Sequence, residues 1–407
     1  MDVAAHVVLV GGGHAAAAFV NSVRRAGFDG RVTLLSDEPV PPYHRPPLSK
    51  KYLSESLPVE QIFIRAAAWY AEQKVELRLG VRVARIDRHA ACVWLDSGEQ
   101  VGYDKLVLLT GARPRRLPAD IGGDLQGVLT MRSLADADAL APHLQAGKRL
   151  LVVGGGYIGL EAAAVASAKG LAVTLIEGAP RILQRVAAPA TSDYFRQLHR
   201  GHGVTIKEGV SLHRLLGTDG AVSGAELSDG SQLHVDVVLA GIGVLPNVEL
   251  AQQAGLHIDN GITVDAFCRT SDPNILAAGD CTSFEFRGQR VRLESVQNAN
   301  DQGAAAAHAV LGDDKPYKPL PWFWSDQYDI KLQIAGLNLG YDDVLLRPGK
   351  TPTSQSVWYY RGEQLLAVDA MSDAAAFVTA KKLLERGASV PKASVLDRSA
   401  EFKNWLA

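Results

Sequence analysis

Two glycine clusters, at residues 10–16 and 153–159, have the composition and spacing to bind phosphate groups. Each follows an apolar run and precedes an Ala-rich run, the strand–turn–helix order in which backbone N–H groups and a helix N-terminus face a pyrophosphate. The first copy departs from the full pattern, because Ala16 stands where a third glycine is expected. One copy is a weak signal, but two in the same context predict two bound dinucleotides and electron transfer between them.

A polar or acidic residue follows each cluster at the end of the next apolar run. Glu177 is placed where a carboxylate accepts hydrogen bonds from both hydroxyls of an adenosine ribose and repels a 2′-phosphate. This favours NADH over NADPH, although Arg181 and Arg185 follow closely and could bind phosphate. The equivalent position after the first cluster is Ser36, so we expect the ribose contact there from Asp37, with Ser36 as the alternative.

Hydrophobic periodicity indicates that both clusters lie in βαβ units. Strand, helix and strand are expected at 7–10, 15–27 and 31–35, and again at 150–153, 158–170 and 173–176. The predicted fold class is therefore α/β with two Rossmann-like dinucleotide-binding domains.

A repeated strand-and-glycine pattern marks the expected domain boundaries. Residues 104–114 read as an apolar strand followed by a Gly/Pro break, and residues 236–246 echo them. The second nucleotide-binding domain, 113–243, is therefore expected to be inserted in the first, 1–112 and 244–318. A strand at 275–278 would join the first domain after the insertion.

From Pro319 onward the sequence changes character and predicts a C-terminal α+β domain at 319–407. Its expected elements are an aromatic cluster at 322–324, antiparallel strands at 357–360 and 364–370 around the turn Arg361-Gly362, and a helix from about 373 to 386 that Asp373 caps and Gly387 ends.

Composition argues against several other classes of protein. With 407 residues, a net charge of −2 and 47% hydrophobic residues, the chain has the composition of a globular protein without a nucleic-acid-binding surface. No secretory signal or membrane span is expected. The cysteines, Cys92, Cys268 and Cys281, form no C-x-x-C pair, which fits a reducing cytoplasm and excludes a redox dithiol. No metal site is expected.

Further motifs are the run Pro42-Tyr43-His44-Arg45-Pro46-Pro47-Leu48-Ser49-Lys50, the run Thr110-Gly111-Ala112-Arg113-Pro114, Glu161 after the second cluster, and Ala278-Gly279-Asp280. Together and in this order they resemble the FAD-dependent ferredoxin reductases of bacterial cytochrome P-450 and Rieske oxygenase systems, over essentially the whole chain. The resemblance implies a glutathione-reductase-like flavoprotein architecture. Non-covalent FAD would lie in the first unit and NADH in the second, with the nicotinamide stacked on the isoalloxazine ring.

The resemblance also implies which residues contact each cofactor. FAD would be held by Gly11, Gly13, Arg45, Thr110, Gly111 and Asp280, with Val296 and Trp324 beside the ring, and NADH by Gly154, Gly156, Gly159, Glu177 and Arg185. Further cofactor contacts are expected from His14, Ala15, Val83, Arg132, Tyr157, Ile158 and Gly243. From its chemistry alone, Trp324 is equally well explained as a core aromatic residue.

Lys50 and Glu161 are the expected catalytic pair, also by resemblance. An ammonium near the flavin N5 would stabilise negative charge that develops on hydride transfer, and Glu161 would keep Lys50 charged and aimed. Without the resemblance, Lys50 reads as the start of a polar helix and Glu161 as a carboxylate that favours a helix dipole.

The predicted function is hydride transfer from NADH to FAD, followed by one-electron transfers to an acidic, transiently bound [2Fe–2S] ferredoxin. Arg287, Arg290 and Arg292, which alternate on an expected hairpin, are candidates for its docking patch, although a solvated strand face explains them as well. Alternatives are reduction of a quinone, oxygen or ascorbate radical, a rubredoxin reductase, or an NADH-sensing flavoprotein. A cytoplasmic monomer or weak dimer is expected.

Overall fold

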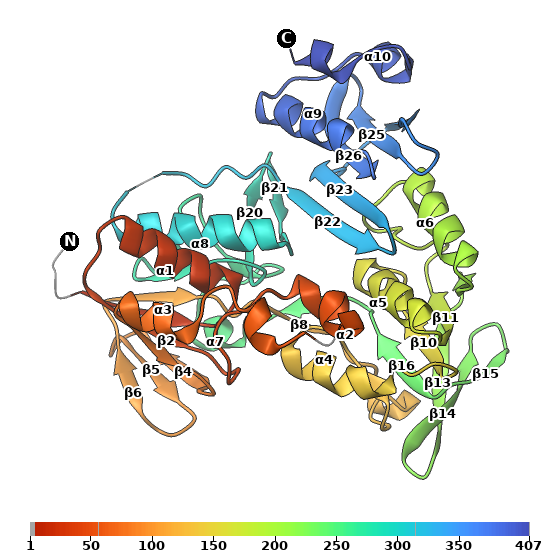
Figure 1. Ribbon diagram of the computed structural model, residues 1–407. Coiled ribbons are helices and arrows are strands. Elements are labelled where there is room, and N and C mark those ends of the chain that lie inside the picture. Colours follow the sequence, from red (N-terminus) through yellow and green to blue (C-terminus); the bar gives the residue numbers. More distant parts are fainter. Residues whose placement is uncertain (1–4, 56, 314, 407) are drawn as a thin grey trace. The chain divides into compact units, whose positions relative to one another are not determined.

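The structure, a computed structural model, describes residues 5–55, 57–313 and 315–406 of the chain (Figure 1). It divides into two compact units. Unit 1 comprises Met1–His44, Pro58–Arg113 and Leu245–Pro319, and unit 2 comprises Arg45–Leu57, Pro114–Val244 and Leu320–Ala407. The segment Arg45–Leu57, which the sequence placed in the first domain, is thus part of unit 2, whereas the finer division into three domains stays a prediction.

Unit 1 is built on a five-stranded parallel sheet of order β19-β7-β1-β2-β3. Helices α1 and α8 lie side by side against this sheet (Figure 1). The bounds are β1 (His6–Val10), α1 (His14–Arg25), β2 (Arg31–Leu35), β3 (Val75–Arg78), β7 (Lys105–Leu108), β19 (Ile275–Ala277) and α8 (Val296–Val310). The predicted return of the chain to the first sheet after the insertion is confirmed, because Ile275 to Ala277 pair with Leu106 to Leu108.

Smaller elements complete unit 1. They include a three-stranded meander, β4 to β6, for which the sequence analysis made no prediction, and the hairpin β20–β21. Their bounds are η2 (Val59–Ile62), α3 (Ala67–Glu72), β4 (Val83–Asp87), β5 (Cys92–Leu95), β6 (Gln100–Gly102), α7 (Glu249–Gln253), β18 (Ile262–Thr263), β20 (Thr282–Phe286) and β21 (Gln289–Val291). Strands β8 (Ala112–Pro114) and β17 (Val244–Pro246) fall where the chain passes between the units.

Unit 2 contains a second five-stranded parallel sheet, of order β12-β11-β10-β16-β9, and a meander β13 to β15. Its fifth strand, β9, precedes the others in the chain, whereas β19 of unit 1 follows them. Helix α5 packs on β10 and β11. The bounds are η1 (Pro46–Ser49), α2 (Lys51–Glu55), η3 (Ala119–Ile121), β9 (Val128–Leu129), α4 (Leu134–Leu140), η4 (Ala141–His143), β10 (Arg149–Val153), α5 (Tyr157–Ala168), β11 (Ala172–Glu177), α6 (Pro189–Gly201), β12 (Thr205–Glu208), β13 (Leu212–Thr218), β14 (Ala221–Leu227), β15 (Gln232–His234) and β16 (Val237–Ala240).

The remainder of unit 2 is an antiparallel sheet of order β22-β23-β26-β25-β24, covered by α9. Asp373 caps α9 through Ala376 N at 3.1 Å, and Gly387 follows the helix at φ +64°, as the sequence predicted. The bounds are β22 (Trp322–Gln327), β23 (Ile330–Gly336), β24 (Asp343–Pro348), β25 (Gln355–Arg361), β26 (Gln364–Met371), α9 (Ala374–Glu385), α10 (Lys392–Leu396) and η5 (Phe402–Trp405). Among the described residues, no helix is long and apolar enough to cross a bilayer.

A buried carboxyl group joins this sheet to α6. Asp369 on β26 is 1% exposed and accepts hydrogen bonds from the Tyr359 hydroxyl and, at 2.7 Å, from Thr191 Oγ1. Tyr359 Oη also accepts from Ala188 N at 2.8 Å. Burial raises the pKa of Asp369 to about 6, because its charged form loses hydration, while hydrogen bonds from Tyr359 and Thr191 oppose the shift.

We expect Asp369 to destabilise the folded chain as pH rises through about 6. The folded pKa lies above the ordinary value of 3.8, so the folded state binds the proton more tightly than the unfolded state. Binding of this proton therefore contributes fully to the free energy of unfolding below pH 3.8, and the contribution is lost by pH 7. The difference is about 3 kcal/mol. Urea unfolding of the wild type and of Asp369→Asn between pH 4 and pH 7 tests this. The difference between the two stability curves should change with pH, and parallel curves would contradict the expectation.

Candidate functional site

Both glycine clusters form tight turns that only glycine can adopt. Gly11 has φ +117° and Gly154 has φ +109°. A Cβ at Gly11 would overlap Leu109 O, and one at Gly154 would lie 2.5 Å from Gly241 O. Each turn therefore passes directly against the end of the neighbouring strand, which brings its backbone close to any ligand at that edge of the sheet.

The third position of each cluster shows why the two copies differ. A Cβ at Gly159 would overlap Gly154 O, so the second copy requires glycine there. Ala16 occupies the matching position in unit 1 and is fully buried. The close approach in unit 1 lies elsewhere, at Gly303 of α8, where a Cβ would overlap Ala15 O.

The helices that follow the two clusters begin without side-chain caps. The N-cap residues are Gly13 for α1 and Gly156 for α5, and neither helix has an acidic residue in its first turn. By contrast, Ser295 caps α8 and Asp373 caps α9 through their side chains. The positive ends of α1 and α5 therefore suit an anionic ligand such as a pyrophosphate.

The strand register places Ser36 and Glu177, two of the expected ribose contacts, at equivalent positions in the two units. Val10 pairs with Leu35 in unit 1, and Val153 pairs with Ile176 in unit 2, so Ser36 is the structural equivalent of Glu177. Glu177 is held in place by Gly155 N at 2.7 Å and Ala179 N at 2.8 Å, one to each carboxylate oxygen. Its remaining lone pairs can accept hydrogen bonds from ribose hydroxyls.

Ser36 provides the test of whether unit 1 fits a dinucleotide. Its side chain is 1% exposed, and its Oγ has no hydrogen-bond partner among the described residues. A Cβ at Gly12 would overlap this Oγ, so the hydroxyl stands beside the fingerprint turn. A ligand hydroxyl there would satisfy it, and the residues present therefore fit FAD. Asp37, the contact that the sequence favoured, is exposed, and the choice between the two stays open.

The other predicted flavin contacts of unit 1 follow its strands. Thr110 and Gly111 come directly after β7, where Asn247 ties this turn by accepting at its carbonyl from Thr110 Oγ1 at 2.6 Å and donating to Gly111 O at 3.0 Å. Asp280 is 8% exposed and follows Gly279, whose φ is +87°. The remaining contacts lie at the start of α1 (His14, Ala15), at the start of β4 (Val83) and at the start of α8 (Val296).

Lys50 and Glu161 form an ion pair, with Nζ 3.0 Å from Oε1. Glu161 is 3% exposed on α5 and accepts hydrogen bonds from Ser49 Oγ and Ser325 Oγ, both at 2.7 Å. Asp326 lies 3.8 Å from the same ammonium. Three separate segments of unit 2 thus converge on this pair, and both carboxylate oxygens of Glu161 have a hydroxyl donor.

Ser49, Ser325 and Asp326 were not predicted from the sequence. Ser49 adjoins Lys50, and Ser325 and Asp326 follow Trp324 in the sequence. Residues close to them on the chain were therefore already candidates. No pattern in the sequence indicates that these segments meet on Glu161.

The predicted residues of unit 2 fall into two further groups. Arg45 donates from Nη1 to Arg132 O at 3.0 Å, which brings together an expected FAD contact and another expected cofactor contact. Trp324 lies on β22 directly before Ser325, whose hydroxyl donates to Glu161. The Trp324 ring stacks on that of Trp322, with 5.6 Å between the ring centroids. Arg45, Arg132 and Trp324 all belong to unit 2, whereas the predicted flavin contacts described above belong to unit 1.

The remaining predicted residues surround the second fingerprint or lie downstream of it. The Tyr157 ring packs on Phe323 at 4.8 Å, and its buried hydroxyl has no hydrogen-bond partner in the described chain. Ile158 is 42% exposed and is therefore accessible to a ligand. Arg185 and Gly243 are also exposed.

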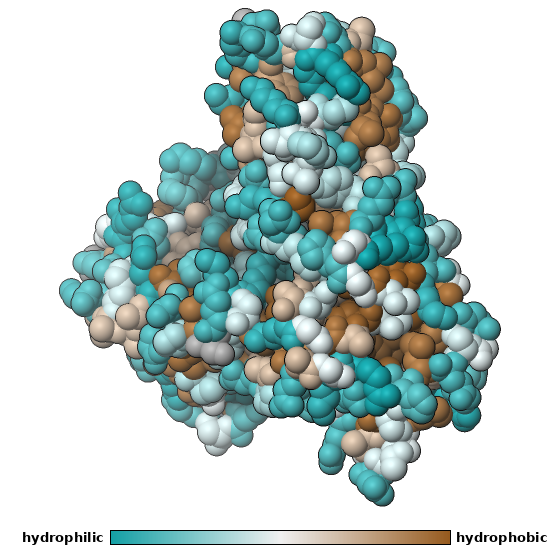
Figure 2. All heavy atoms as spheres, turned by 45° about the vertical axis from the view of Figure 1, so that its right-hand side comes forward, coloured by the Kyte–Doolittle hydropathy of each residue, from teal (hydrophilic) through white to brown (hydrophobic). Residues whose placement is uncertain are grey.

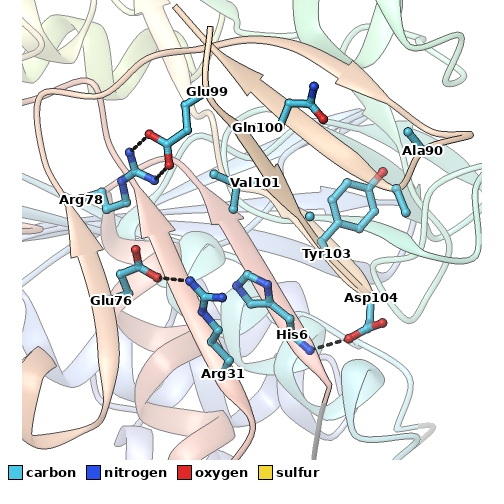
Figure 3. Close-up of a pocket in the computed structure, with 12 residues that line it drawn as sticks. His6, Arg31, Glu76, Arg78, Ala90, Glu99, Gln100, Val101, Tyr103 and Asp104 are labelled. Carbon is cyan, nitrogen blue, oxygen red and sulfur yellow. Dashed lines mark hydrogen bonds and ion pairs between the residues drawn. The ribbon is translucent and has the colours of Figure 1, made fainter. Parts of the chain in front are cut away.

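Unit 1 also contains a hollow lined by charged side chains. This hollow of about 470 Å³ contains the ion pairs Arg31–Glu76 (2.8 Å) and Arg78–Glu99 (2.6 Å) (Figure 3). It extends from His6 and Arg31, where β1 and β2 begin, to Arg78 at the end of β3. Each of its two arginines is paired with a glutamate. Figure 2 shows apolar side chains on one face of the molecule. The large apolar residues that are exposed are Ile158, Ile242, Leu339, Leu346, Val378 and Leu396.

The expected hairpin with three arginines exists, but the arginines do not form a simple basic stripe. Arg287 lies in the turn, Arg290 lies 3.5 Å from Asp259, and Arg292 is paired with Glu294. Partial neutralisation by these carboxylates weakens this hairpin as a docking patch.

The cysteines Cys92, Cys268 and Cys281 are buried free thiols, and burial raises the pKa of Cys268 and Cys281.

Comparison with known proteins places this arrangement in a family. Residues 5–303 match the pyridine nucleotide-disulphide oxidoreductase family, and residues 322–406 match the reductase C-terminal family. The chain is 40% identical to a ferredoxin--NAD(P)(+) reductase from Sphingomonas sp. over 98% of this chain and 97% of that protein. It is also 40% identical to putidaredoxin reductase from Pseudomonas putida, over 99% and 97%.

A solved structure agrees with these relatives. The crystal structure of a covalent putidaredoxin reductase–putidaredoxin complex matches with a TM-score of 0.95 and 39% identity, over 99% of this chain and 98% of that chain. The predicted fold class and resemblance are thus confirmed. The chain belongs to the pyridine nucleotide-disulphide oxidoreductase family and, within it, to the FAD-containing ferredoxin--NAD(P)(+) reductases.

Proposed function

We propose that this chain transfers electrons from NADH, by way of bound FAD, to a [2Fe–2S] ferredoxin that serves a cytochrome P-450 or Rieske oxygenase. The observation that carries the proposal is the pair of uncapped fingerprint helices, α1 and α5, one in each unit. Bound FAD would accept a hydride and release electrons singly, which links a two-electron donor to a one-electron carrier. The relatives named ferredoxin reductases support the choice of acceptor.

The residues of unit 1 would hold FAD. The turn at Gly11 to Gly13 and the start of α1 offer backbone N–H groups to the pyrophosphate, and Ser36 or Asp37 would bind the ribose. Thr110, Gly111 and Asp280 would contact the rest of the cofactor. Arg45, Arg132 and Trp324, which belong to unit 2, stay proposed cofactor contacts by resemblance.

The Lys50 ammonium, held in place by Glu161, would supply a fixed positive charge. Two serine hydroxyls orient the Glu161 carboxylate, and the carboxylate in turn holds the Lys50 ammonium at 3.0 Å. A cation held in this way needs no reorganisation when negative charge develops beside it. We propose that this is its role next to the flavin.

Unit 2 would bind NADH in preference to NADPH. The Glu177 carboxylate is fixed by two backbone N–H groups at the end of β11, where it can accept from both ribose hydroxyls. A 2′-phosphate would meet this negative charge directly. The turn at Gly154 to Gly156, with Arg185, would hold the pyrophosphate.

The acceptor is proposed to be acidic and its association transient, with the reductase acting as a monomer or weak dimer in a reducing cytoplasm. Complementary charge between a basic reductase surface and an acidic carrier accelerates encounter while leaving the complex short-lived. The rate of ferredoxin reduction should therefore fall as salt rises.

A stopped-flow comparison of acceptors tests the proposed function. The FAD-loaded protein, reduced with dithionite, should be reoxidised at least about tenfold faster by a [2Fe–2S] ferredoxin than by rubredoxin, quinone or oxygen at equal concentration. A purified protein that is colourless and takes up no FAD would contradict the proposal at its first step. Rapid reoxidation by quinone or oxygen, with none by ferredoxin, would assign it to reduction of small molecules instead.

A further inference from the structure

The loop at residues 178–188, between β11 and α6, lies directly against the second fingerprint turn. Leu183 N donates to Gly155 O at 2.9 Å. A Cβ at Gly155 would lie only 2.6 Å from Ile182 Cγ2, so this glycine is needed for the loop and not only for phosphate. Side chains on this loop are therefore within reach of a nucleotide whose ribose is read by Glu177.

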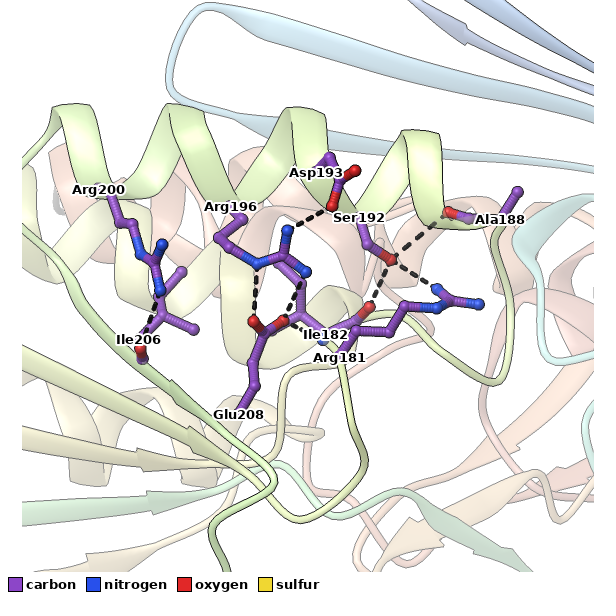
Figure 4. Close-up of polar contacts among 9 residues, drawn as sticks. All are labelled: Arg181, Ile182, Ala188, Ser192, Asp193, Arg196, Arg200, Ile206 and Glu208. Carbon is purple, nitrogen blue, oxygen red and sulfur yellow. Dashed lines mark hydrogen bonds and ion pairs between the residues drawn. The ribbon is translucent and has the colours of Figure 1, made fainter. Parts of the chain in front are cut away.

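Arg181 is one of two arginines on this loop, with Arg185, that the sequence predicts as possible phosphate ligands. An arginine close to the ribose-reading position is a common means of binding the 2′-phosphate of NADP. In the structure its guanidinium is turned onto α6 (Figure 4). Nη1 donates to Ser192 Oγ at 2.6 Å, and Nη2 donates to Gln184 O at 3.3 Å.

Ser192 connects this guanidinium to the backbone of the same loop. Its side chain is fully buried in the first turn of α6, and its Oγ donates to Ile182 O at 2.6 Å while accepting from Arg181. The hydroxyl thus uses its single proton on the loop and its lone pair on the arginine. Both contacts depend on one oxygen atom.

The carboxylate of Glu208, near this loop, is paired with another arginine. Glu208 accepts from Arg196 Nε at 2.7 Å and Nη2 at 3.0 Å, and from Ile182 N at 2.7 Å (Figure 4). Within the described chain, Arg181 forms no ion pair, so a neutral hydroxyl is its only side-chain partner. If the Ser192 hydroxyl is removed, the guanidinium keeps only its 3.3 Å hydrogen bond to Gln184 O and can turn to a phosphate.

Arg185 has a different environment in the same loop. It is exposed and makes no hydrogen bond or ion pair with the residues that the structure describes. It is therefore available to any nucleotide phosphate, whereas Arg181 is held back. The two arginines are not interchangeable, although the sequence presents them alike.

We propose that Ser192 is a specificity-determining residue, whose hydroxyl holds the Arg181 guanidinium on α6 and so withholds it from a 2′-phosphate beside Glu177. The inference rests on the proposed binding of NADH at Glu177. Selection against NADPH then has two parts, a carboxylate that repels the phosphate and a cation that is kept from compensating for it. Ser192 acts through Arg181 and is a positioning residue.

Binding of oxidised cofactors to the FAD-loaded protein tests this without turnover. Dissociation constants of NAD⁺ and NADP⁺ are measured by isothermal titration calorimetry for the wild type, Ser192→Ala, and Ser192→Ala combined with Arg181→Ala. We expect Ser192→Ala to bind NADP⁺ about tenfold more tightly, or about 1.4 kcal/mol. Its affinity for NAD⁺ should stay within about twofold. The double variant should lose the gain, because the gain requires the released arginine.

Ser167→Ala is the matched control, because Ser167 also donates from its hydroxyl to a backbone carbonyl in unit 2, that of His202 at 2.8 Å. It should leave both affinities unchanged, and Ser192→Thr, which keeps the hydroxyl, should behave as the wild type. Arg181→Ala alone gives a test that does not depend on the folding of Ser192→Ala. If Arg181 is withheld, its removal leaves NADP⁺ affinity within about twofold of the wild type.

Two results would overturn the proposal. One is a Ser192→Ala variant that binds NAD⁺ normally without improved NADP⁺ affinity. The other is a single Arg181→Ala variant whose NADP⁺ affinity falls about tenfold, since the guanidinium would then already contact the phosphate. A wild-type protein that binds neither nucleotide would instead contradict the proposed function, so the two failures can be told apart.

Discussion

Replacing Lys50 with alanine should slow hydride transfer from NADH to FAD by about 100-fold, while the affinity for NADH changes little. The reason is electrostatic, because a fixed donor next to a developing negative charge typically contributes about 100- to 1,000-fold. We expect the lower value, since Glu161 stands 3.0 Å from the ammonium and offsets part of its field. Anaerobic stopped-flow, following the flavin absorption band at several NADH concentrations, separates the transfer rate from binding.

Lys51→Ala is the control for this prediction. Lys51 is the next residue in the chain and is exposed, and it forms no ion pair with the described residues. Its removal should leave the transfer rate unchanged. The Glu161→Gln variant adds a second comparison, because it keeps both serine hydrogen bonds possible but removes the charge that aims Lys50. An unaltered transfer rate in Lys50→Ala would remove this residue from the mechanism.

Glu177→Ala should weaken NADH binding by about 10- to 100-fold and reduce the discrimination against NADPH. Hydrogen bonds to a charged group contribute about 1.5–3 kcal/mol, and the variant loses those to the ribose hydroxyls. It also frees Gly155 N and Ala179 N, which bind the carboxylate in the wild type and could then donate to a 2′-phosphate. Steady-state kcat and KM for both cofactors, with a constant electron acceptor, measure the two effects.

The control is Glu363→Ala, which removes an exposed carboxylate elsewhere in unit 2. It should not change the ratio of kcat/KM for NADH and NADPH. If Glu177→Ala also leaves both constants as they are in the wild type, Glu177 does not read the ribose. A general loss of stability would lower the amount of folded protein with both cofactors and would not alter the ratio.

The fingerprint units were predictable because local patterns determine them. Strand β2 was predicted with its observed bounds, Arg31–Leu35, and the helix cap at Asp373 was found where the sequence placed it. Alternation, glycine turns and capping residues act over a few neighbouring positions. The meanders β4–β6 and β13–β15 escaped prediction, because short, half-exposed strands such as Val83–Asp87 lack a continuous apolar run.

The site was predictable only in part. Ser36 was aligned with Glu177 from the sequence, and the strand register supports that equivalence. Lys50 and Glu161 could be paired only through a resemblance. Ser49, which adjoins Lys50, is 112 positions from Glu161 in the sequence, and local sequence patterns do not predict contacts over such a separation. The hydroxyl of Ser325 reaches the same carboxylate from still further along the chain, with a sequence separation of 164 residues.

By itself, then, the sequence determined that two glycine turns exist, which positions after the next strand are expected to contact ribose, and which residue types can carry charge beside them. Only the tertiary structure decided which of these groups are available. Arg181 and Arg185 look alike in the sequence, yet Arg181 donates to Ser192 Oγ, whereas Arg185 makes no hydrogen bond with the residues that the structure describes. The physical reason is that a side chain's availability depends on the hydrogen-bond partners that packing brings to it, and those partners come from distant parts of the chain.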